Sequence, residues 1–77
     1  MSKKSQLKKE IDDVEREIHA YEQKRERSQN ALIRAMLAGK KPSKEDEQYF
    51  NVFSELIDKA RERVRELYAE LEALDKK

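Results

Sequence analysis

The sequence predicts an all-α protein, a two-helix antiparallel coiled-coil hairpin. Apolar residues recur at alternating spacings of three and four in two long runs, and the only Gly and the only Pro lie between these runs. Charged residues make up 45% of the chain, and this composition with helical periodicity is typical of long helices and coiled coils. We therefore expect a single domain, residues 1–77, with helices at 3–38 and 43–76 and a turn at 39–42.

The first helix is predicted from a row of seam positions, the positions that would face the other helix. These positions are Leu7, Ile11, Val14, Ile18, Tyr21, Arg25, Ser28, Leu32, Ala35 and Gly39. Its middle, residues 22–30, contains no apolar residue. We expect the helix to continue through this stretch because its residues have good helix propensity and include neither Gly nor Pro.

The turn is predicted from a helix stop followed at once by a helix start. Gly39 suits the left-handed position that commonly ends a helix, and Pro42 cannot continue one. Ser43 is a good N-cap, and Asp46 three residues later resembles the acid of a capping box. The acidic residues 45–47 also suit the positive end of a helix dipole.

The second helix has a more regular seam, and its polar faces carry acid–base pairs four residues apart that support helicity. Its seam positions are Phe50, Phe53, Ile57, Ala60, Val64, Leu67, Leu71 and Leu74. Folding the chain back near residue 41 would bring Arg25 close to Asp58 and Glu62. We expect a partly buried ion pair there that sets the register of the two helices. Alternatively, Arg25 reaches solvent and pairs with Glu22 or with no partner.

Near the bend the apolar residues spread over more of each helix than a two-helix seam requires. The residues predicted to bind a partner are Ile33, Met36, Leu37, Tyr49, Val52, Phe53 and Leu56. A hairpin of this size has a small core, and exposed apolar surface marks partner sites. We expect completion to a four-helix bundle, by a homodimer or by a different protein partner. The alternative is that the surplus residues cover the bend of a monomer.

Enzymatic chemistry is not predicted. The chain has no Cys, and a single Gly cannot build a phosphate-binding loop. His19, the only histidine, lies among acidic helical residues and is best explained as a surface residue, so we predict neither a metal nor a cofactor. No apolar run reaches the roughly 20 residues that cross a bilayer, and no signal peptide is expected. A cytoplasmic protein is the resulting expectation.

Nucleic-acid binding is a second hypothesis. Short basic clusters, such as Lys40, Lys41 and Lys44 around the turn, could contact a phosphate backbone. Acidic residues interrupt most of the clusters, however, and 18 basic residues are nearly balanced by 17 acidic ones. The leading prediction is therefore a non-enzymatic protein–protein interaction module, an adaptor or chaperone-like protein that binds through apolar faces near the bend.

The pattern Leu32-x-x-x-Met36-Leu37-x-Gly39, a short turn and then Tyr49 resembles the small co-chaperones of type III secretion needle subunits. On the second helix the resemblance continues through Leu56, Ala60, Val64 and Leu67, and it covers roughly residues 29–68. The first helix is longer and more charged than is usual in that family. The resemblance implies a helical hairpin that, with a partner chaperone, would hold an aggregation-prone needle subunit in the cytoplasm.

Overall fold

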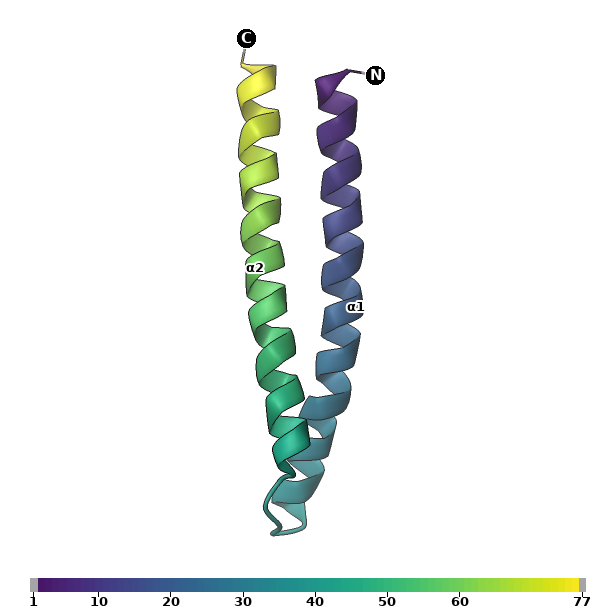
Figure 1. Ribbon diagram of the computed structural model, residues 1–77, viewed down its shortest axis with the longest axis vertical. Helices are drawn as coiled ribbons and strands as arrows, with labels where there is room; N and C mark the ends of the chain where they lie inside the picture. Colours follow the sequence, from purple (N-terminus) through teal and green to yellow (C-terminus); the bar gives the residue numbers. More distant parts are fainter. Residues whose placement is uncertain (1, 77) are drawn as a thin grey trace.

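The computed structural model, which describes residues 2–76, is an antiparallel pair of long helices (Figure 1). Helix α1 spans Lys3–Leu37 and helix α2 spans Lys44–Asp75. The predicted all-α, two-helix hairpin is confirmed, and each helix end lies within one residue of the predicted boundary. The Cα trace measures 58 Å by 17 Å by 16 Å. The start of α1 and the end of α2 lie side by side, and Lys4 Nζ is 2.8 Å from Asp75 Oδ1.

The predicted seam residues are the residues that each helix covers on the other. Leu7, Ile11, Ile57 and Leu67 are buried, together with Ser28, and the remaining seam positions except Gly39 are half-buried. A cluster of buried side chains lies toward the chain ends, where Leu7 and Ile11 pack with Leu67, and Val14, Leu71 and Leu74 pack against this cluster. Ser28, a small polar residue, is the buried seam residue in the polar middle of α1. The helix is unbroken in this region, although residues 22–30 include no apolar side chain.

A Schellman motif ends α1. Gly39 has a φ of 68°, its N–H donates to the Met36 carbonyl at 3.0 Å, and the Lys40 N–H donates to the Ala35 carbonyl at 2.9 Å. At the start of α2 the Ser43 hydroxyl accepts from the Asp46 N–H at 3.1 Å and donates to the Asp46 carboxylate at 2.8 Å. Gly39 and Ser43 therefore act as the sequence predicts, and together they reverse the chain.

Replacing Gly39 by alanine is expected to lower the free energy of unfolding by about 1 kcal/mol, because an L-residue is strained at positive φ. A Cβ at this position would meet no atom within 4 Å, so the loss reports backbone strain alone. Urea unfolding followed by circular dichroism measures it. Gly39→Asn serves as the control and should lose less, since asparagine tolerates this conformation better. Equal stability of Gly39→Ala and the natural chain would contradict the prediction.

Arg25 meets a different neighbour from the one predicted. Its guanidinium donates from Nη1 to the Ser54 hydroxyl at 3.5 Å, and its Cζ lies 5.9 Å from the centre of the Phe50 ring. Asp58 lies one turn beyond Ser54 and is exposed, and an Arg25–Asp58 ion pair is not among those formed within residues 2–76. The helices are offset by about one turn from a fold-back at residue 41. A register role for Arg25 stays a prediction, with Ser54 and Phe50 as its contacts.

Candidate interaction surface

The hairpin has two faces, and the ion pairs identify which residues lie on each. Arg63 and Glu10, each immediately before a seam residue, approach to 3.5 Å, so residues preceding the seam share one face. Arg61 and Glu22, each immediately after a seam residue, approach to 3.2 Å on the other. We call the first the groove face, because hollows between α1 and α2 open on it.

The residues predicted to bind a partner divide between these two faces. Tyr49, Val52 and Leu56 each precede a seam residue and lie on the groove face, beside the seam residue Phe53. Ile33 and Met36 each follow a seam residue and therefore lie on the opposite face. Leu37, the last residue of α1, is 83% exposed and Met36 is 73% exposed. The apolar surplus near the bend thus forms two separate surfaces.

The groove-face surface is the more continuous of the two because aromatic rings connect its parts. The Phe53 ring stacks on Tyr21 and on Tyr49, with 6.2 Å between centroids in each pair. Lys24 Nζ lies 5.8 Å from the centre of the same Phe53 ring. Phe53 and Leu56 are half-buried, whereas Tyr49 and Val52 are 56% and 51% exposed. The rings of Tyr21, Phe53 and Tyr49 therefore form a row. Its Tyr21 and Phe53 members are half-buried, and its Tyr49 member is open to solvent.

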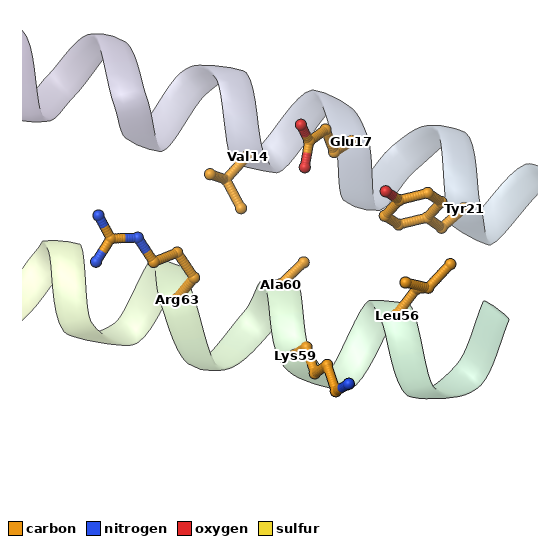
Figure 2. Close-up of a pocket in the computed structure, with 7 residues that line it drawn as sticks. All are labelled: Val14, Glu17, Tyr21, Leu56, Lys59, Ala60 and Arg63. Atoms are coloured by element: carbon orange, nitrogen blue, oxygen red, sulfur yellow. The ribbon is translucent and has the colours of Figure 1, made fainter. Parts of the chain in front are cut away.

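Figure 2 shows the central hollow of the groove face. Val14 and Tyr21 of α1 and Leu56 and Ala60 of α2 turn toward one another across the space between the helices. Glu17, Lys59 and Arg63 form its edges, and the Lys59 side chain points away from α1. A second hollow toward the bend is lined by Lys24, Arg27, Ser28, Asp46, Tyr49 and Phe53. The groove face therefore combines apolar floors with charged edges of both signs.

Tyr21, Lys24 and Arg27 were not predicted as site residues. Each of them lines a hollow together with apolar residues of α2. Tyr21 is a seam residue, whereas Lys24 and Arg27 each immediately precede a seam residue. The signal was present in the sequence, because in an antiparallel pair the residues preceding the seam on both helices share a face. The apolar residues of one helix taken alone do not identify this face, because it depends on how the two seams combine.

His19 lies on the exposed surface of α1 beside Asp12, Glu15 and Arg16. Among residues 2–76, no group of three or more His, Asp or Glu side chains is arranged as metal ligands would be. Neither α1 nor α2, as far as the structure describes them, has a stretch long and apolar enough to cross a membrane.

The comparisons with known proteins find no counterpart: no family model matches the chain, and neither the curated proteins nor the solved structures include a match.

Proposed function

We propose that the hairpin is a non-enzymatic protein–protein interaction module that associates through its groove face on the bend side of Leu56. The observation that carries this proposal is the aromatic row of Tyr21, Phe53 and Tyr49 with Val52 beside it. Large apolar side chains that stay half exposed on a rigid helix are typical of partner-binding surfaces. The helices hold these side chains at fixed spacing, so little ordering is needed when a partner binds.

The total exposed area of the chain supports association. The hairpin exposes 6398 Å², whereas a compact monomer of its 9.2 kDa mass exposes about 4,900 Å². The difference is roughly 1,500 Å², and a standard protein–protein interface buries about 800 Å² on each partner. Burial of one face of the hairpin in a standard interface would therefore remove about half of this excess.

A protein is favoured over a nucleic acid as the partner. Lys24 and Arg27 line the hollow near the bend together with two aromatic rings. Proteins that bind single-stranded nucleic acids commonly combine basic and aromatic side chains in this way. Asp46 lies in the same hollow and Glu17 in the central one, so a phosphate backbone would meet carboxylates along its path. Helical partners with side chains of both signs suit these edges better.

The type III secretion reading is a narrower form of this proposal and rests on the resemblance. Of the residues that carry it, Met36, Leu37 and Tyr49 are exposed. Met36 and Leu37 lie away from the groove face, so a co-chaperone of this kind would have a second contact surface at the end of α1. In that reading, one surface would hold the partner chaperone and the other the needle subunit.

Val52→Asp is expected to weaken association by about tenfold or more, because the new carboxylate would be buried without a partner. Association is measured as the solution mass of the pure chain in sedimentation equilibrium. It is also measured as the retention of proteins from an extract of the source organism by the immobilised chain. Asn51→Asp is the matched control, since it adds the same charge at a neighbouring exposed position that follows the seam residue Phe50.

The natural chain and Asn51→Asp should associate equally, and Val52→Asp should remain helical by circular dichroism. A natural chain that stays monomeric at every concentration and retains no protein would contradict the proposal. Association that Val52→Asp leaves unchanged would also contradict it.

A further inference from the structure

Helix α1 carries a stripe of residues in which acidic and basic side chains are separated along its length. The stripe consists of Asp13, Glu17, Ala20, Lys24 and Arg27, spaced alternately by four and three. Each residue immediately precedes a seam residue, so the whole stripe lies on the groove face. Toward the chain ends it is acidic, toward the bend it is basic, and the small Ala20 lies at its centre.

The four charged residues of the stripe are exposed, and none takes part in the ion pairs formed within residues 2–76. Elsewhere on the groove face, Arg63 contacts both Glu10 and Glu66 at 3.5 Å. Lys24 lies over the Phe53 ring, and Arg27 lines the hollow near the bend. The stripe therefore presents two carboxylates and two cations to whatever covers this face.

We infer that a second copy of this chain covers the groove face, antiparallel to the first, with a two-fold axis near Ala20. The inference rests on the proposed function, and it names the occupant of that surface. About a two-fold at Ala20, Asp13 of each copy faces Arg27 of the other. In the same way Glu17 faces Lys24. Asp13 and Arg27 each lie seven residues from Ala20, about 10 Å along the helix, and Glu17 and Lys24 lie three and four residues from it. Both pairs are therefore within one residue of register at once.

Between the two α1 helices, the centre of this arrangement is apolar. Ala20 has no side chain beyond Cβ, so the two α1 helices can approach closely at the axis. The hollow of Figure 2 lies at the same height, because Tyr21 is the neighbour of Ala20 and faces Leu56 across the groove. Two copies would bring two such hollows together and cover the exposed parts of Val14, Tyr21 and Leu56. The result is a four-helix bundle with charged pairs on both sides of an apolar centre.

A parallel arrangement, with both bends at the same end, fits the charges less well. In a parallel face-to-face dimer, α1 of one copy faces α2 of the other at equal height. Because Ile11 packs against Leu67, Asp13 would lie between the heights of Arg63 and Glu66 of the other copy. Lys24 and Arg27 would lie opposite the uncharged Val52 and Leu56. The antiparallel arrangement instead gives each charged residue of the stripe an opposite charge.

The test uses full-length variants in which each stripe carries charges of one sign. K24E/R27E makes the stripe wholly acidic, and D13K/E17K makes it wholly basic. We expect the natural chain to sediment as a dimer at low salt. Each variant alone should have a dissociation constant raised by about tenfold or more, since attraction becomes repulsion at both pairs. An equimolar mixture of the two variants should recover a one-to-one dimer.

The control separates this contact from general attraction between oppositely charged chains. K8E/R65E changes the net charge by the same amount as K24E/R27E. Lys8 and Arg65 lie off the groove face and are exposed. Neither residue takes part in the ion pairs formed within residues 2–76. This control variant should dimerise like the natural chain, and mixing it with D13K/E17K should give no one-to-one dimer.

Each other outcome overturns the inference. A monomeric natural chain that retains a different protein, sensitive to Val52→Asp, would refute the second copy and leave the proposed function standing. If both stripe variants formed dimers like the natural chain, the contact between the copies would have to lie elsewhere. Variants that lose the dimer without recovering it on mixing would exclude the antiparallel pairing. Circular dichroism of every variant establishes that a lost dimer is not a lost fold.

Discussion

Replacing Leu67 by alanine is expected to lower the free energy of unfolding by about 2–5 kcal/mol. Leu67 is fully buried and lies at the centre of the cluster formed with Leu7 and Ile11. Only four apolar side chains in residues 2–76 are buried, so the loss of one removes a large share of the core. Urea unfolding followed by circular dichroism at low temperature, where the variant keeps a folded baseline, provides the measurement.

Leu37→Ala is the matched control because it removes the same atoms from an exposed position. Leu37 is 83% exposed at the end of α1, and its truncation should change the free energy of unfolding by no more than about 0.5 kcal/mol. If Leu67→Ala and Leu37→Ala had similar effects, the packing of the two helices would differ from the one described. The comparison is made at a chain concentration low enough to keep association from adding to stability.

Replacing Glu26 by proline is expected to cost about 3 kcal/mol or more, because proline removes a backbone hydrogen bond and clashes with the preceding turn. Glu26 lies in the polar middle of α1, is exposed, and takes no part in the ion pairs within residues 2–76. Its side chain therefore contributes little, and the loss measures the continuity of the helix. Loss of ellipticity at 222 nm and of resistance to urea are the readouts.

Glu26→Ala controls for removal of the glutamate and should leave stability equal or slightly higher, since alanine is the better helix former. Similar stability of the proline and alanine variants would mean that α1 is already interrupted between residues 22 and 30. This outcome would contradict the unbroken helix Lys3–Leu37 and, with it, the placement of Ser28 in the seam.

Much of the fold could be predicted from the sequence because the seam, the caps and the turn all depend on local rules. The spacing of Leu7, Ile11 and Leu67 follows from helical periodicity, and a helix stop at Gly39 follows from its tolerance of positive φ. Even the polar middle of α1 was predicted to be helical, because propensity and the absence of breakers act over a few residues. These features need no knowledge of what lies across the seam.

The candidate surface was predicted less completely because it depends on how the two helices are placed against each other. An offset of one turn brings Ser54 and Phe50 to Arg25, and spacing along one helix cannot fix that offset. Placing Met36 and Tyr49 on opposite faces required both seams to be combined. The position of Lys24 over the Phe53 ring likewise depends on the placement of the two helices, because the two residues belong to different helices.

The position of the chain ends has a mechanical consequence. Because the start of α1 and the end of α2 lie at the same end of the hairpin (Figure 1), a pulling force applied between them separates the helices from that end first. The first contacts under load are Lys4 with Asp75 and then the cluster of Leu7, Ile11 and Leu67. The bend half has fewer buried side chains, so resistance to extension is greatest at the outset and declines once that cluster has parted.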